Sequence, residues 1–231
     1  MKILYVLGLI FCLELAVAKP IPFRALYQAN YKGLPINAVG VRELRETDSN
    51  KFLFSSSART FFSSIKEESL FSWDQQIIPI EYRYIRQGLG KDKNDLITFD
   101  WKTGTANYSN QNHIITHGVI DKLAYQLQLR QDLIKVNNAP WPMMSYMVME
   151  GNHLKRYEFT VRGKQDTETR IGKFKTVKLD RVKDNTDRKT TFWLALEYDF
   201  LLVKFKQSEP GDTFELLLKQ AEINGSQIRG D

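Results

Sequence analysis

Apolar residues recur at every second position through much of this chain. The clearest run is residues 97–102, in which Ile97, Phe99 and Trp101 alternate with polar side chains. Further runs of this kind occur at residues 78–84, 157–161, 192–196, 201–205 and 214–218. Successive side chains of a β-strand point to opposite faces of a sheet, so each run predicts a strand with one apolar face. The chain is therefore predicted to be mainly β.

Short turns separate these runs. Gly-containing segments at residues 102–104, 150–152 and 209–212 each join two runs, as in a hairpin. Pro79 lies inside a run and predicts an edge or bulge position, because proline lacks the backbone N–H that a sheet requires. Strands that follow one another in this way form a meander, whose edges must be closed or covered.

One segment has helical spacing instead. Ile120, Leu123, Ala124, Leu127 and Ile134 predict a helix over residues 119–134, and the segment 137–140 (Asn-Asn-Ala-Pro) ends it. Asp121 falls in the first turn, where a carboxylate suits the helix dipole. The polar residues of the segment mostly fall on the other sides of the helix: Gln126, Gln128, Arg130 and Gln131.

The first eighteen residues are typical of a secretory signal peptide. Lys2 gives a positive start, residues 3–13 carry no charge, and Ala16-Val17-Ala18 supplies the small-x-small cleavage pattern. We expect cleavage after Ala18, which leaves residues 19–231 as a single β-rich domain. Eleven apolar residues are too few to cross a bilayer, which needs about 20.

The single cysteine, Cys12, lies within this segment, so it leaves the chain on cleavage. Lipidation of Cys12 is the alternative, but the residues before a lipidated cysteine are small and Ile10 and Phe11 are not. Thiol and disulfide chemistry are therefore not expected in the mature protein.

Catalytic patterns are not evident. The chain has no Gly-x-Ser-x-Gly pattern, no phosphate loop and no dinucleotide-binding glycine pattern. His113, His117 and Asp121 stand four apart and would share one helix face, but Gly118 and the β-branched residues between the histidines favour a strand. We expect no metal, no cofactor and no catalysis, although a pair of carboxylates for a hydrolase is not readable from sequence.

The formal net charge of +6 would suit an anionic partner. Nucleic acid is not expected, because the basic residues are spread along the strands and the chain carries an export signal. Attraction to anionic lipid headgroups, and so peripheral contact with a membrane, fits the charge, and a generic solvated surface fits it equally well. We expect a monomer.

The segment 141–149 has the most distinctive local composition. Met143, Met144, Met147 and Met149 lie within seven positions, beside Trp141 and Tyr146. Thioether side chains adapt to varied apolar shapes, so the cluster would suit a pocket for acyl chains or a movable flap. The alternative is a core strand that uses methionine as filler.

Six stretches, in order along nearly the whole mature chain, resemble the proteobacterial exported family named domain of unknown function 3108. The most specific is residues 121–133, and the others are residues 23–33, 79–84, 99–101, 172–177 and 192–195. Residues 201–204 depart from the family, which has Leu-Pro-Val-Arg where this chain has Leu-Leu-Val-Lys.

Members of this family resemble the lipoprotein carriers LolA and LolB, in which an incomplete antiparallel barrel wraps an apolar cavity covered by helices. The resemblance implies a mainly β fold, with a single antiparallel, strongly curved sheet or incomplete barrel and the helix 119–134 in its mouth. A one-residue slip in register would invert which faces line a cavity. The expected lining residues are Tyr82, Tyr84, Phe99, Trp101, Leu123, Leu127, Met147, Met149, Trp193 and Phe205.

These observations favour a periplasmic, non-catalytic binder or carrier of a lipid-like or acylated ligand, with a lipid or an acylated protein as its partner. The alternative is an envelope interaction or scaffold protein with a filled core and no small-molecule ligand.

Overall fold

The computed structural model of the chain describes residues 19–32, 34–88, 90–136, 140–182 and 187–231. The predicted signal peptide, residues 1–18, lies outside the described residues.

Sixteen strands in the described part of the chain form one sheet, whose order is β8-β7-β6-β5-β4-β3-β2-β1-β15-β14-β13-β12-β11-β10-β9, with β16 beside β15. The first wing consists of β1 (Phe23–Tyr31), β2 (Leu34–Asp48), β3 (Lys51–Arg59), β4 (Ser64–Trp73), β5 (Ile77–Gln87), β6 (Lys93–Asp100), β7 (Thr105–Tyr108) and β8 (Gln111–Ile114). The second consists of β9 (Val119–Asp121), β10 (Met144–Glu150), β11 (His153–Thr169), β12 (Gly172–Val182), β13 (Lys189–Ala195), β14 (Leu201–Glu209), β15 (Asp212–Ile223) and β16 (Ser226–Gln227).

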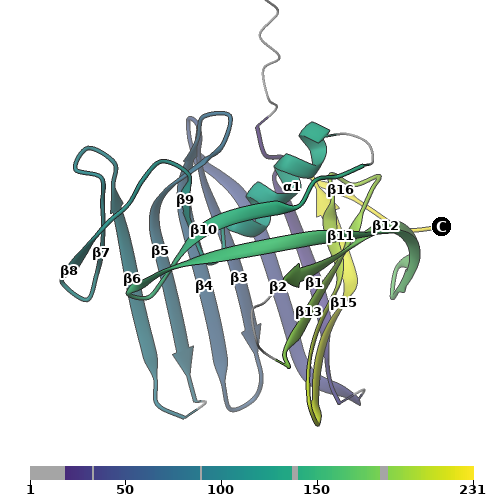
Figure 1. Cartoon of the computed structure of the whole chain (residues 1–231). Helices are drawn as coiled ribbons and strands as arrows, with labels where there is room; N and C mark the ends of the chain where they lie inside the picture. The colour runs from purple at the N-terminus through teal and green to yellow at the C-terminus, as the bar shows by residue number, and fades with distance from the viewer. Residues whose placement is uncertain (1–18, 33, 89, 137–139, 183–186) are drawn as a thin grey trace, which may run out of the picture.

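The sheet is an open, strongly curved barrel, as the resemblance implies. Sequential strands within each wing pair as antiparallel neighbours, except that β9 and β10 are parallel, and β1 joins the wings by pairing with β15. The second wing folds back, so that β10 and β11 cross in front of β3–β6 (Figure 1). Strands β8 and β9 are the two free edges, and the fifteen-strand path between them does not close. The mainly β prediction is confirmed.

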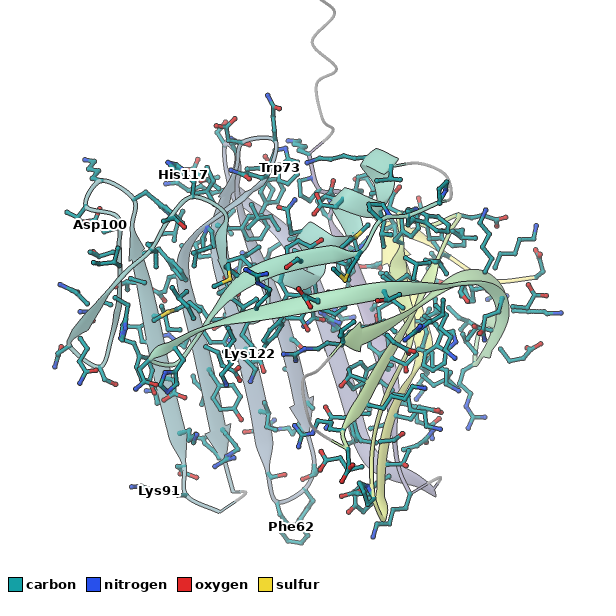
Figure 2. All side chains as sticks on the ribbon, viewed as in Figure 1. Phe62, Trp73, Lys91, Asp100, His117 and Lys122 are labelled. Carbon is teal, nitrogen blue, oxygen red and sulfur yellow. The ribbon has the colours of Figure 1, made fainter. Side chains whose placement is uncertain are left out.

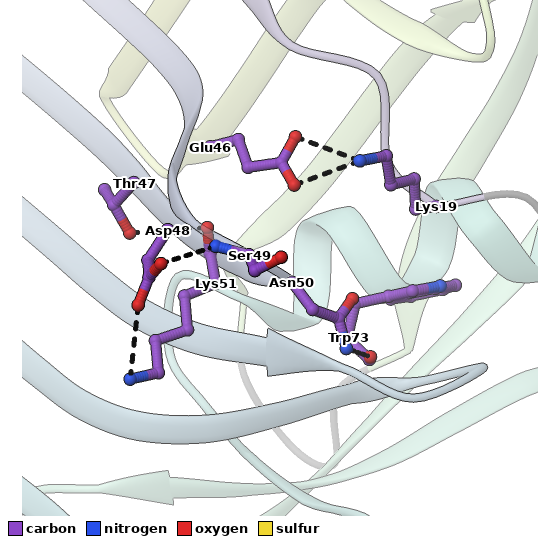
Figure 3. A network of polar contacts seen from close by, with 8 residues as sticks. All are labelled: Lys19, Glu46, Thr47, Asp48, Ser49, Asn50, Lys51 and Trp73. Atoms are coloured by element: carbon purple, nitrogen blue, oxygen red, sulfur yellow. Dashed lines mark hydrogen bonds and ion pairs between the residues drawn. The ribbon is translucent and has the colours of Figure 1, made fainter.

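The two ends of the barrel differ. The turns β3–β4 and β5–β6, which carry Phe62 and Lys91, lie at one end, called here the turn end (Figure 2). Trp73 and His117 lie toward the opposite end, called here the helix end, where α1 sits within the curve of the sheet (Figures 1 and 2). At the helix end the Lys19 ammonium donates to both carboxylate oxygens of Glu46, at 3.0 Å each (Figure 3).

The helix α1 spans Tyr125–Val136, six residues later than residue 119, where its start was predicted. Residues Val119–Asp121 instead form β9, parallel to β10. Asp121 therefore precedes the helix, where its Oδ1 accepts the N–H groups of Leu123 and Ala124 at 2.8 Å each. A carboxylate at this position caps the helix start, since the first N–H groups have no partner within the helix.

The sheet surrounds α1 on more sides than its amphipathic pattern predicts. Gln128, Arg130 and Gln131 are buried, although they were expected on the sides away from the core. Each polar group that leaves solvent needs a partner. Gln128 Oε1 accepts the Ile77 N–H at 2.8 Å, and Arg130 Nε donates to the Asp199 carbonyl at 2.9 Å. These bonds attach the helix to two separate parts of the barrel.

The predicted alternation of buried and exposed side chains is confirmed in strands that have one face in solvent. In β6, Ile97 and Phe99 are buried while Thr98 and Asp100 are exposed. Pro79 lies at a register shift between β4 and β5, as a bulge position predicts. The interior is packed with aromatic rings, such as Phe52 stacked on Phe71 with 5.6 Å between centroids. In the described part of the chain, no helix is both long and apolar enough to span a bilayer.

Candidate functional site

A cleft of about 460 Å³ lies between the start of α1 and the second wing of the sheet. Its volume falls within the range of roughly 300–1,000 Å³ that is typical of small-molecule sites. We call it the basic cleft, and its lining residues are Glu67, Lys122, Tyr125, Gln126, Glu150, Lys155, Tyr157, Arg181, Arg188, Thr190, Phe192, Phe205 and Gln207.

Cations outnumber carboxylates in the basic cleft, by four to two. Glu150 is held by its neighbours: Lys155 Nζ lies 3.0 Å and Lys122 Nζ 3.8 Å from its carboxylate, and the Tyr157 hydroxyl donates to it at 2.8 Å. Burial opposes ionisation of Glu150, but the hydrogen bonds from Lys155 and Tyr157 outweigh it and lower the pKa. Glu150 is therefore a fixed negative charge that positions two lysines.

Glu67 behaves in the opposite way. Burial raises the pKa of its carboxyl, although the positive charges of Lys122 and Arg42 act against the shift. Glu67 thus lies in surroundings that disfavour its ionised form, whereas Glu150 lies in surroundings that favour it.

Arg181 is the cation best placed to receive a ligand. Its guanidinium lies over the Tyr157 ring, with 3.3 Å from the guanidinium carbon to the ring centroid. Stacking of this kind leaves the N–H edge of an arginine free for hydrogen bonds. Arg181 Nε is buried and has no hydrogen-bond partner among the described residues. A buried donor without a partner is costly, and a carboxylate or phosphate oxygen would satisfy it.

Aromatic rings line the basic cleft beside its cations. Phe192 packs edge-on against Phe205 at 5.3 Å between centroids, and Tyr125 packs edge-on against Tyr157 at 5.2 Å. The site thus presents aromatic and charged side chains to the same space.

The basic cleft adjoins a second, apolar void inside the barrel. Gln126 and Phe192 line both, and Gln126 accepts a hydrogen bond of 2.6 Å from Arg42 at the boundary. The void has only about 20 Å³, and a single water needs about 10–15 Å³ by the same measure. The apolar interior is thus filled by its own side chains.

Another cleft, of about 540 Å³, lies beside α1 and includes Asp132 and Tyr146. The Tyr146 hydroxyl donates to Asp132 at 2.8 Å. The walls of this cleft are mainly polar, as are those of the basic cleft, and Tyr146 is the aromatic residue in its lining.

The residues predicted to line a cavity are divided between several environments. Leu127 lines the apolar void and Phe205 lines the basic cleft. The remaining inward-facing residues are packed in or against the hydrophobic core: Tyr82, Tyr84, Phe99, Trp101, Leu123 and Met149.

Two of the predicted lining residues face elsewhere. Trp193 is buried on the face of β13 opposite to Phe192, and Lys178 and Lys204 cover its ring at 5.6 and 5.3 Å. Phe192 lines both the basic cleft and the apolar void. Met147 lies on the solvent side of β10, with 37% of its surface exposed, while Tyr146 beside it is buried.

The segment 141–149 contains most of β10, whose Ser145 and Tyr146 line the cleft of about 540 Å³. Met144 and Met149 are buried in β10, and Met143 and Met147 are exposed. None of the four lines the basic cleft or the apolar void.

The histidines and Asp121 do not form a common site. His117 stacks against Trp101 at 5.8 Å, whereas Asp121 Oδ2 accepts the Ser69 hydroxyl at 2.5 Å inside the barrel. Across the residues that the structure describes, no three or more His, Cys, Asp and Glu side chains are grouped closely enough to hold a metal ion.

Sequence reasoning missed most of the basic cleft. Lys155 and Arg181 stand in polar positions of strands, and such positions normally face solvent. They meet Lys122 only because β11 and β12 fold across the first wing. The local signals were Tyr157, Phe192 and Phe205 in their alternating runs, and Phe205 was among the expected lining residues.

The fold and the basic cleft together define a class: an open, β-barrel-like protein with one enclosed helix. A family profile matches residues 26–219, and the chain belongs to that family, DUF3108, a protein family of unknown function. No curated protein sequence matches the chain.

Among the solved structures, the chain is similar to a β-barrel-like protein of the domain of unknown function DUF1849 from Brucella abortus. The two chains are 11% identical, the match covers 88% of this chain and 98% of that one, and the TM-score is 0.55. At this identity the likeness shows a shared fold and nothing of the ligand.

Proposed function

We propose that this protein is an exported, non-catalytic binding or carrier protein for a lipid-like or acylated ligand with an anionic group. The observation that carries the proposal is that cations and aromatic rings line the same basic cleft. An amphipathic ligand needs both kinds of side chain close enough for one molecule to contact them together.

The positions of the cations and the rings suggest how such a ligand is oriented. Its anionic group lies against Arg181 and Lys122, where the unpartnered Nε of Arg181 gains a hydrogen bond. Its apolar part lies along Phe192 and Phe205, and the burial of that surface supplies most of the binding free energy.

The filled interior sets a condition on this function. The apolar void is too small for an acyl chain, so a long chain enters only if α1 moves away from Phe192. The Arg42–Gln126 hydrogen bond joins α1 to β2 at this boundary, and it must break for the helix to move. A ligand with a short apolar part is held in the basic cleft without such a movement.

The same filled interior favours a second function, that of an envelope interaction or scaffold protein without a small-molecule ligand. In this alternative the aromatic residues serve only the core, and the basic cleft holds water. The uptake of a ligand distinguishes the two functions.

Titration with a fluorescent fatty acid tests the proposal. Arg181→Gln removes the cation and keeps most of the side-chain volume, so uptake is expected to weaken by about tenfold or more, since hydrogen bonds to charged groups contribute about 1.5–3 kcal/mol. The matched control is Arg156→Gln, because Arg156 is on the same wing with 68% of its side chain exposed. Uptake by this control should equal that of the wild type.

Equal uptake by the Arg181 and Arg156 variants would remove the basic cleft from the proposal. Absence of uptake by the wild-type protein, with no lipid recovered from it, would favour the scaffold function instead.

Export is the remaining part of the proposal. Cleavage after Ala18 would give a mature chain that begins at Lys19, and N-terminal sequencing of the protein from the periplasm checks this. A chain that retains Met1 in the cytoplasm would contradict it.

A further inference from the structure

Two phenylalanine rings project into solvent at the turn end of the barrel. Phe61 and Phe62 are 91% and 81% exposed, and they pack edge-on against each other with 4.9 Å between centroids. Neither ring belongs to the hydrophobic core or packs against it. Figure 2 shows Phe62 at the extreme of the β3–β4 hairpin. Large aromatic side chains that are exposed together at a hairpin tip are typical of a binding surface.

The turn that carries these rings is well ordered by its own hydrogen bonds. The Thr60 N–H donates to the Ser63 carbonyl at 2.8 Å, and Thr60 Oγ1 accepts the N–H groups of Phe62 and Ser63 at 3.3 and 3.0 Å. The backbone is therefore fixed, and the rings are presented to solvent without the entropic cost of ordering a loop on binding.

The neighbouring β5–β6 hairpin supports the turn from the side. Gly88 approaches the Phe62 carbonyl so closely that a side chain at position 88 would collide with it. The Gly88 N–H donates to Asp92 Oδ1 at 3.1 Å, which fixes the second turn. The two hairpins thus form one protruding surface, called here the aromatic tip, which contains residues 59–63 and the described residues of 88–93.

The charge around the rings is positive. Arg59, Lys91 and Lys93 are exposed within the aromatic tip, against the single carboxylate of Asp92. Two aromatic rings beside three cations fit a membrane surface, in which anionic headgroups lie above apolar acyl chains. A second copy of this chain fits less well, because packing two tips together would bring like charges into contact.

We propose that the aromatic tip docks this protein on an anionic lipid membrane. The rings of Phe61 and Phe62 enter the interface between headgroups and acyl chains, where aromatic side chains are favoured. Arg59, Lys91 and Lys93 then lie at the level of the phosphates. The observations behind this docking are independent of the basic cleft, but docking affects where the cleft lies. The cleft residue Arg188 pairs with Glu209 beside the β14–β15 turn, which lies at the same end of the barrel, so docking brings the cleft toward the membrane.

Co-sedimentation with vesicles tests the docking. The probes are vesicles of phosphatidylethanolamine mixed with phosphatidylglycerol, and vesicles of phosphatidylcholine alone. The proteins are the wild type, the double variant Phe61→Ser/Phe62→Ser, and Ile114→Ser as the control, all purified from cells that express the full chain. Ile114 is 83% exposed but lies on the edge strand β8, away from the tip. Circular dichroism melts check that all three fold alike.

The wild type and Ile114→Ser should bind the phosphatidylglycerol vesicles alike, and bind phosphatidylcholine more weakly. The double variant should bind the phosphatidylglycerol vesicles at least about tenfold more weakly, because it lacks the two phenylalanine side chains that the docked wild type buries in the membrane. A Phe62→Trp variant should also show a blue shift of its emission on those vesicles, beyond that of the wild type.

Two results would overturn the docking. The first is equal vesicle binding by the double variant and the wild type, or no binding by either. The second is a wild-type dimer in sedimentation velocity that the double variant converts to a monomer, because the aromatic tip would then contact a second copy of this chain.

Discussion

Asp121 joins three parts of the barrel through one carboxylate. Its Oδ1 caps the start of α1, and its Oδ2 accepts the Ser69 hydroxyl of β4, while the residue itself is the last of β9. Burial raises the pKa of Asp121 to about 6, although the hydrogen bonds from Ser69, Ala124 and Leu123 act against the shift. The side chain is thus held where its ionised form is disfavoured.

This pKa makes the stability of the protein pH-dependent. The folded state binds the Asp121 proton more tightly than the unfolded chain does. Protonation of Asp121 therefore stabilises the fold; this contribution is complete below about pH 4 and is lost as the pH rises through about 6. The shift from 3.8 to about 6 corresponds to about 3 kcal/mol.

Asp121→Asn should remove this dependence, because the amide oxygen still caps the helix but does not ionise. The difference in free energy of unfolding between variant and wild type, measured in urea, should change by about 2 kcal/mol from pH 4 to pH 7 in favour of the variant. A constant difference across this range would contradict the role of Asp121.

At the level of single residues, the sequence predicts which side chains of a strand point inward only where the other face of that strand is exposed to solvent. Ile97 and Phe99 of β6 follow the alternation because Thr98 and Asp100 meet solvent. Strand β13 is buried on both faces, so its alternation carries no information about which face is inner. That is why Trp193 was expected inside and Phe192 was missed. Arg181 was missed for a related reason, since a charged residue in a strand normally faces solvent.

At the level of elements, turns and the existence of one helix could be predicted, but the start of the helix could not. Residues 119–121 carry both a helical spacing and β-branched side chains, and their pairing with β10 decides between the two. Residue 119 is 28 positions before its partner Met147, so no local pattern reveals the pairing. Asp121 consequently moves from the first turn of a helix to its cap.

The contact between two hairpins at the turn end makes a prediction at this scale. Gly88 and Gly90 both have positive φ, of 78° and 67°, but only Gly88 lies against the Phe62 carbonyl, whereas a side chain at position 90 would meet open space. Gly88→Ala should therefore cost about 1–3 kcal/mol more than Gly90→Ala in free energy of unfolding, because it adds a collision to the same backbone strain.

Urea unfolding of both variants provides the comparison. Equal losses would show that the hairpins are not held together at Gly88, and the aromatic tip would then not be one surface.

At the level of the whole molecule, a meander could be predicted from the order of the strands. The pairing that joins its two wings, and the way the second wing folds back, could not. The pairing of β1 with β15 joins residue 23 to residue 223, and the return of β10 and β11 across β3–β6 creates the basic cleft from distant segments. The arrangement gives the barrel a filled apolar interior beside a charged and aromatic cleft. A binding protein for an anionic amphiphile is the function that this pairing favours.

Native mass spectrometry of the wild-type protein, purified gently from the periplasm and followed by lipid extraction, tests that function most directly. The account predicts a mass above that of the chain from Lys19 onward, with an acidic lipid or acylated molecule recovered in proportion to the protein and depleted in Arg181→Gln. A single mass equal to the bare chain, with no lipid in the extract and no uptake of a fluorescent fatty acid afterwards, would contradict it.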